Sequence, residues 1–210
     1  GANINVGTAS AATGGTYNGF KLNWDNGGNI IAAVDYQTSQ NSAYTSGSVS
    51  SFDRTATRYS VGYKYAAGSI VSLQYWNKDR TDKTSGTNAL VLPYNTSGYT
   101  TTNTGSGKDS GYVANLNHAI SSNVMAIVQY AKANNMSNYN GVEVADSGAT
   151  GYSLGGIYRL SKRTHVYGAV HQIQNGIAAN YGFSGGNYQS GTNGAGSTVN
   201  MTALGFQHNF

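Results

Sequence analysis

The chain ends on the stretch Leu204-Gly205-Phe206-Gln207-His208-Asn209-Phe210, in which apolar or ring side chains alternate with other residues up to the final position. Because successive side chains of a β-strand point to opposite faces, Phe206, His208 and Phe210 share one face. Chain ends are usually polar and frayed, so a stripe of this kind needs an apolar neighbour. The closing strand of an outer-membrane barrel has one, because its outward face meets lipid and its end lies at an aromatic girdle. The ending therefore predicts an all-β, antiparallel transmembrane β-barrel.

The composition agrees with a membrane barrel, although no segment is hydrophobic enough for a membrane helix. Hydrophobic residues make up 39% of the chain and the mean hydropathy is −0.39, with no apolar run near the roughly 18 residues of a spanning helix. A closed barrel then remains as the way to cross a bilayer, because every backbone amide must be paired there. Charged residues reach only 10%, against about 25% in ordinary globular domains. The chain has no Cys, which excludes disulfides, thiol catalysis and thiolate metal sites.

Alternating segments predict nine clear strands and a possible tenth, joined in turn by very short and very long connections. The strands are 17–24, 29–36, 58–65, 69–77, 111–120, 124–133, 151–160, 164–174 and 199–210, with the tenth at 3–9. The first hairpin turn contains Asn26-Gly27, a strong hairpin signal. Connections rich in Ser, Thr, Asn and Gly fall at every second position, as in barrels with short periplasmic turns and long external loops; they are 37–57, 78–109, 134–149 and 175–198.

The two sides of these strands differ in character. With Phe210 at the periplasmic rim, aromatic side chains form two girdles: Trp24, Tyr65 and Tyr158 on the periplasmic side and Tyr36, Tyr59, Tyr75, Tyr112, Tyr130 and Tyr152 on the outer side. The opposite parity is polar and is predicted to line a pore with Lys21, Asn23, Asp35, Lys64, Gln74, Asn115, Asn117, Gln129 and Arg159. A soluble sandwich would turn its apolar face inward, and parity alone does not separate the two folds. The ordered Tyr, the loop alternation and the terminal Phe favour the barrel.

Two segments resemble the general porins of betaproteobacteria. The run Gly151-Tyr152-Ser153-Leu154-Gly155-Gly156-Ile157-Tyr158-Arg159-Leu160-Ser161-Lys162-Arg163-Thr164 is similar to that family's penultimate hairpin. The chain end is similar to its terminal assembly signal, carried here by Gly205, Phe206, His208 and Phe210. The resemblance implies a trimer of sixteen-stranded barrels in the outer membrane of a Gram-negative bacterium. It also implies passive diffusion of ions and small hydrophilic solutes, in many members with anion preference.

The chain also departs from that family. Gln207 and Asn209 stand where members commonly have Arg, so some positive charge near the terminus is missing. Sixteen strands need more than the 210 residues present, so we expect either the C-terminal part of a longer porin or a smaller, even-stranded barrel. The odd count of clear strands favours the first. In both cases residues 1–210 form a single barrel domain.

Charge gives a hint about selectivity. The net charge is +4, with Lys21, Lys64 and Arg159 on the inward parity; the other bases are expected in loops, among them Arg54, Arg58, Lys78, Arg80, Lys83 and Lys108. Like charges in a throat of low dielectric concentrate counter-ions, which predicts a weak anion preference. The alternative is a structural or interaction barrel that does not conduct and whose long outer loops bind a partner.

Catalysis, metal binding and nucleic-acid binding are not expected, and no cofactor is predicted. His118 falls near the periplasmic end of its strand on the lipid-facing parity, and His208 belongs to the terminal stripe. His165 and His171 share a parity but lie six residues apart, roughly 20 Å along a strand, too far to share a metal. No cluster of Lys or Arg with stacking aromatics marks a nucleic-acid surface. The expected partners are outer-membrane lipid, two further copies of the chain, and small hydrophilic solutes and anions.

Overall fold

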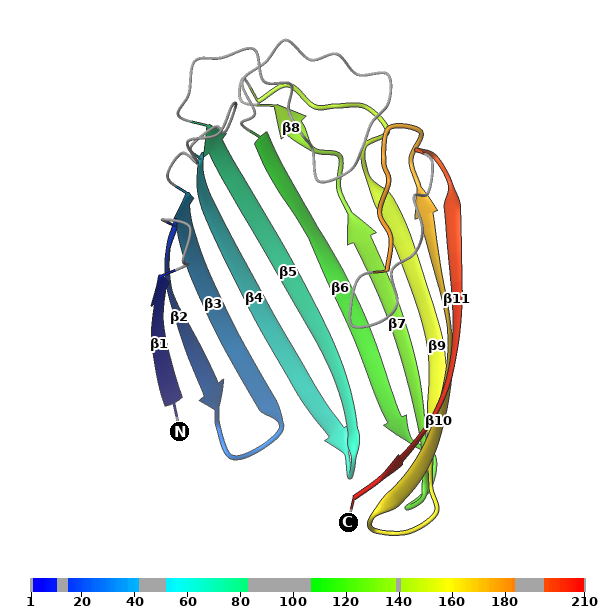
Figure 1. The fold of residues 1–210 in the computed structure, drawn as a ribbon. Coiled ribbons are helices and arrows are strands. Elements are labelled where there is room, and N and C mark those ends of the chain that lie inside the picture. Colours follow the sequence, from blue (N-terminus) through cyan, green and yellow to red (C-terminus); the bar gives the residue numbers. More distant parts are fainter. Residues whose placement is uncertain are drawn as a thin grey trace.

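A computed structural model describes residues 2–10, 15–41, 52–82, 107–138, 141–183 and 195–209. Over these ranges the protein is all-β (Figure 1). The strands are β1 (Ala2–Ser10), β2 (Gly15–Asp25), β3 (Ile30–Asn41), β4 (Phe52–Ala66), β5 (Ser69–Asp82), β6 (Gly107–Ala119), β7 (Val124–Ala133), β8 (Ser137–Asn138), β9 (Ala149–Arg159), β10 (Thr164–Asn175) and β11 (Thr198–His208). No helical segment with the length and apolar character needed to cross a bilayer occurs in these ranges.

All strands belong to one antiparallel sheet in which neighbours along the chain are neighbours in space. The pairing order is β1-β2-β3-β4-β5-β6-β7-β9-β10-β11, and the short β8 pairs with β6. In the described part of the chain, β1 and β11 are the two edges of this sheet. Figure 1 shows the sheet curved around a concave side, with the tight turns and both chain ends at its lower end and the short β8 at its upper end.

The nine predicted strands are confirmed, and so is the possible tenth, which is β1. The upper ends are longer than predicted, since β3 continues to Asn41, β4 starts at Phe52, β5 runs to Asp82 and β6 starts at Gly107. These extensions are mostly polar on both faces, so they lack the alternation that marks a half-buried strand. The prediction of loop charges was therefore wrong for five of the six bases named, because they lie within strands: Arg54, Arg58, Lys78, Arg80 and Lys108. The sixth, Lys83, lies outside the described residues.

Local side-chain hydrogen bonds close the lower turns. Between β2 and β3, Gly27 N donates to Asp25 Oδ1 (2.9 Å) and Gly28 N donates to Asn26 Oδ1 (2.8 Å). Gly27 has φ 74°, in the left-handed region where a residue without Cβ is favoured. The Asn-Gly step thus acts as the sequence predicted, and it fixes the register in which Asp25 lies opposite Ile31.

Candidate functional site

The register separates the side chains into a convex and a concave face. On the convex face, the large apolar side chains are exposed, for example Leu73 (48%), Val128 (43%) and Leu154 (58%). On the opposite face the side chains are mostly polar and half-buried. A soluble sandwich would cover the apolar face with a second sheet, but here every long strand lies in one sheet. An apolar surface of this extent requires an apolar environment such as lipid.

All nine predicted girdle residues lie on the convex face, in two groups. At the upper end Phe20 stacks on Tyr36 (5.5 Å between ring centroids), and Tyr130 contacts both Tyr112 (6.0 Å) and Tyr152 (5.5 Å). At the lower end, Tyr65 stacks on His118, and the Tyr65 hydroxyl and His118 Nδ1 share a hydrogen bond of 2.8 Å. His118 is thus near the lower turns on the convex face, where the sequence placed it. The remaining girdle residues are Trp24, Tyr59, Tyr75 and Tyr158.

The terminal stripe is also on the convex face. Phe206 is 64% exposed, opposite Val166 in β10, and His208 lies opposite Thr164, with a hydrogen bond of 2.8 Å between Thr164 Oγ1 and His208 Nδ1. Gly205, between Leu204 and Phe206, belongs to the concave face. Phe210, the last member of the predicted signal, lies outside the described residues.

The nine residues predicted to line a pore lie on the concave face, spread along the wall. The register brings Lys21 opposite Asp35, and Asn115 opposite both Ser72 and Gln129. The other members are Asn23, Lys64, Gln74, Asn117 and Arg159. No single centre gathers them, so the concave face is a wall with local groups of side chains rather than a compact site.

Charged side chains are concentrated on the part of this wall formed by β2 to β5. Lys21, Asp35 and Arg58 occupy one row across β2, β3 and β4. Lys64 Nζ lies 3.2 Å from Asp25 Oδ2, and Lys78 Nζ lies 3.7 Å from Asp109 Oδ2. Ion pairing therefore compensates the charge of Lys64, which the sequence treated as a free pore charge, while Arg58 joins the wall from a position expected in a loop.

Two acidic groups at the ends of strands have shifted pKa values. The backbone N–H of Gly27 and the ammonium of Lys64 lower the pKa of Asp25 at the lower turn. At the upper end, burial raises the pKa of Asp109, although Lys78 and a hydrogen bond with Trp76 act in the opposite direction. The Asp109 side chain is only 13% exposed, so loss of hydration exceeds the attraction of the nearby ammonium.

Polar side chains form a hydrogen-bonded belt across the wall from β5 to β10. Asn115 Nδ2 donates to Ser72 Oγ (3.4 Å), and Gln129 Nε2 donates to Asn115 Oδ1 (2.7 Å). Ser153 Oγ donates to Gln129 Oε1 (3.5 Å) and shares a hydrogen bond of 2.8 Å with His171 Nδ1. These five residues occupy a single row of the sheet.

The belt ends at residues that the sequence did not mark as a site. His171 was considered only as a catalytic or metal-binding residue and was not predicted to be one, yet its ring packs against Phe183 at 5.8 Å between centroids. Phe183 is an isolated aromatic residue in a Gly-rich connection, so no periodic pattern in the sequence predicts that it contacts a strand. The signal that could have found this contact is the parity of His171, which places its ring on the polar face.

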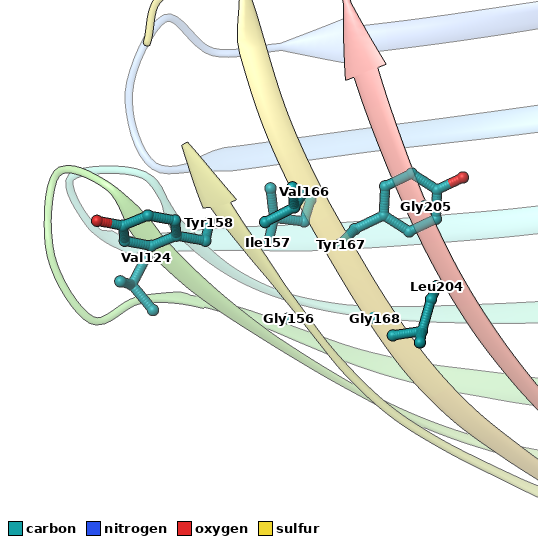
Figure 2. A pocket seen from close by; sticks show the side chains of 9 residues that line it. All are labelled: Val124, Gly156, Ile157, Tyr158, Val166, Tyr167, Gly168, Leu204 and Gly205. Carbon is teal, nitrogen blue, oxygen red and sulfur yellow. The ribbon is translucent and has the colours of Figure 1, made fainter. Parts of the chain in front are cut away.

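An apolar groove of about 450 Å³ lies near the lower end of β7, β9, β10 and β11 (Figure 2). On the convex face, Gly156 and Gly168 leave a gap between Leu204 and the pair Val124 and Tyr158. The other lining residues are Ile157, Val166, Tyr167 and Gly205. Because this lining offers almost no polar groups, the groove suits hydrocarbon rather than a polar substrate. Within the described ranges, no three His, Asp or Glu side chains are close enough to hold a metal ion.

Comparison with solved structures identifies the class of fold. An anion-selective porin from Comamonas acidovorans superimposes with a TM-score of 0.75 at 19% identity, covering 100% of this chain and 56% of that one. OmpT, an outer membrane protein of Vibrio cholerae folded in vitro, superimposes with a TM-score of 0.70 at 11% identity, covering 98% and 59%. The loop L8 deletion mutant of that protein gives a TM-score of 0.65 at 10% identity.

The protein therefore has the antiparallel fold of outer-membrane β-barrels, and it spans little more than half the length of these structures. No family model matches the sequence, and no curated protein matches it. At these identities the likeness defines the fold, and the function has to be argued from the two faces of the sheet.

Proposed function

We propose that this chain forms part of the wall of a water-filled channel in the outer membrane of a Gram-negative bacterium. The channel passes ions and small hydrophilic solutes by passive diffusion, with a weak preference for anions. The observation that carries this proposal is the contrast between the faces: exposed apolar and aromatic side chains on the convex side, polar side chains on the concave side. Lipid against the convex face and water against the concave face would solvate both sets of side chains.

The charges on the concave face support the anion preference. Lys21 and Arg58 lie in one row with Asp35 between them, and two further bases are paired with acids. Bases thus exceed acids on the part of the wall formed by β2 to β5. In a narrow aqueous passage, a surplus of fixed positive charge raises the local concentration of anions. We propose that no catalytic step is involved, since the described groove is apolar and the polar groups spread along a wall.

We further propose that the chain is the C-terminal part of a longer barrel that assembles as a homotrimer. The match to 56% of the porin from Comamonas acidovorans and the linear pairing order from β1 to β11 support this extension. Gly205, Phe206, His208 and Phe210 then serve as its assembly signal, and the nine predicted girdle residues on the convex face serve as its girdles. The convex face contacts outer-membrane lipid.

Reconstitution in planar bilayers tests the proposed channel. We expect discrete ion-conducting steps from the folded full-length protein and, in a salt gradient, a reversal potential whose sign corresponds to anion preference. The same preparation should be checked for a heat-modifiable β-barrel on gels, so that a misfolded sample is recognised. Folded protein that stays silent, or that prefers cations, would contradict the proposal.

A further inference from the structure

The chain does not leave the sheet at the end of β10 but turns back against the concave face. Figure 1 shows this segment, in orange, descending from the upper end beside β10. Asn175, the last residue of β10, holds it with its side chain. Asn175 Nδ2 donates to Tyr181 O (3.0 Å) and to Ser197 O (2.9 Å), and Tyr181 N donates to Asn175 Oδ1 (2.7 Å). One amide thereby fixes both the descending segment and the residue just before β11.

Backbone hydrogen bonds anchor the first half of this segment to the connection before β9 and to the end of its own connection before β11. Gly176 N donates to Gly148 O (2.9 Å), Ala178 N to Asp146 O (3.0 Å) and Gly196 N to Ala179 O (3.0 Å). Ala178 and Ala179 are 4% and 1% exposed, among the most buried side chains in the described ranges. A segment tied by its own backbone and buried to this degree has a defined position.

The second half reaches the level of the hydrogen-bonded belt. Phe183 packs edge-on against His171 at 5.8 Å between ring centroids and an interplanar angle of 62°. His171 lies four residues before Asn175 in the strand, so the segment descends roughly 13 Å along the wall at about 3.4 Å per residue. At that level, the wall beside His171 continues with Ser153, Gln129 and Asn115, which have no ionisable side chain.

We infer that residues 176–183 narrow the channel, with Phe183 against His171 as the residue that sets its size limit. This inference rests on the proposed channel function. The segment Gly176-Ile177-Ala178-Ala179-Asn180-Tyr181-Gly182-Phe183 carries no charge. The narrowing therefore discriminates by size and by hydrogen bonding to neutral groups, and it admits small hydroxylated solutes such as simple sugars. The sign of the preferred ion is set elsewhere, by the charges on β2 to β5.

The absence of Cys in the sequence allows a direct test of the position of this segment. Phe183→Cys places a single thiol in the narrowing, and Val142→Cys places a control thiol in another upper connection, where Val142 is 59% exposed. In refolded full-length protein, a small maleimide should label both variants. A maleimide linked to a large polymer should label the Val142→Cys control much faster than Phe183→Cys. Equal labelling by the large reagent would overturn the inward position.

Conductance and solute flux then test the narrowing itself at pH 8. Attaching a bulky neutral group to Phe183→Cys should lower single-channel conductance roughly twofold, because flow is limited at the narrowest level, and leave the reversal potential unchanged. The same modification of Val142→Cys should change neither quantity. In liposome swelling, Phe183→Ala should speed the entry of a trisaccharide more than that of a monosaccharide.

The outcomes separate the two proposals. If labelling depends on reagent size but the protein never conducts, the proposed channel function is wrong, whereas the inward position of residues 176–183 is retained. A conducting protein whose modified Phe183→Cys variant keeps full conductance, or whose Phe183→Ala variant admits all sugars in the original proportions, would overturn the size limit. A reversal potential that moves with a neutral modification would overturn the assignment of ion preference to β2 to β5.

Discussion

Two sectors of the concave face differ in how their side chains are held. In the sector from β2 to β5, charged groups dominate, and some are paired, as Lys64 is with Asp25 at 3.2 Å. In the sector from β6 to β10, neutral groups such as Gln129 and Ser153 are linked into one belt. Charges act over several ångströms through water, whereas neutral hydrogen bonds act only at contact. The difference indicates that the sector from β2 to β5 favours ions of one sign, whereas the sector from β6 to β10 defines the shape of the proposed channel.

The largest expected effect compares convex with concave positions in both sectors. Leu73→Arg in β5 and Val128→Arg in β7 place a charge on the apolar face, which we expect to cost about 2 to 4 kcal/mol near the bilayer midplane. Gln74→Arg and Gln129→Arg place it on the polar face, and both proteins should fold. The temperature at which the folded band disappears on gels measures the difference.

The two polar-face variants should still differ from each other. Gln74 has one hydrogen bond at 3.3 Å to Ser60, whereas Gln129 joins Asn115 and Ser153 within the belt. We expect Gln129→Arg to lower the unfolding temperature more than Gln74→Arg. If Gln74→Arg unfolded the protein while Leu73→Arg did not, the assignment of faces would be inverted by a register error of one residue.

The next effect concerns a glycine at the edge of the neutral sector. Gly205 lies opposite Tyr167, and a Cβ at Gly205 would overlap the Tyr167 ring. Gly205→Ala should therefore cost about 1 to 3 kcal/mol, as overpacking does in a close contact. In a Tyr167→Ala background the same substitution should cost almost nothing. An unchanged cost in that background would mean that Gly205 is required by the assembly machinery and not by packing.

A smaller effect tests the charged sector itself. Arg58→Gln should move the reversal potential in a salt gradient toward zero, because it removes a base from the row of Lys21 and Asp35. Removing the whole pair of Lys64 and Asp25, by Lys64→Gln together with Asp25→Asn, should move it less, because the pair carries no net charge. Gln129→Ala, in the neutral sector, should leave it unchanged. A larger shift from this double variant than from Arg58→Gln would contradict the role of ion pairing.

The sequence predicted the strands and their two faces, which follow from alternating residues, but few of the contacts that involve the connections between strands. Strands such as Tyr59 to Tyr65 can be recognised in the sequence, because lipid on one face and water on the other require apolar and polar residues to alternate. The ion pair of Lys64 was missed because its partner, Asp25, is 39 residues away in the sequence. The two residues lie in β2 and β4, with β3 between them. Phe183 was missed because an inward-folded connection is fixed by single contacts, here with Asn175 and His171, that leave no periodic trace.

The smallest effect is a pH dependence at the upper end of β6, where Asp109 faces Lys78 of the charged sector. Burial raises the pKa of Asp109 above its usual value of 3.8, so the folded state favours the protonated acid. Its contribution to stability is fully present below that usual value and is lost as the pH rises through the folded-state pKa. Asp109→Asn should therefore resemble the natural protein near about pH 3 and be slightly more stable near about pH 7. Thermal unfolding followed by circular dichroism at both values measures this. An Asn variant that is less stable near neutral pH would mean that the ion pair with Lys78, at 3.7 Å, outweighs the burial of the carboxylate.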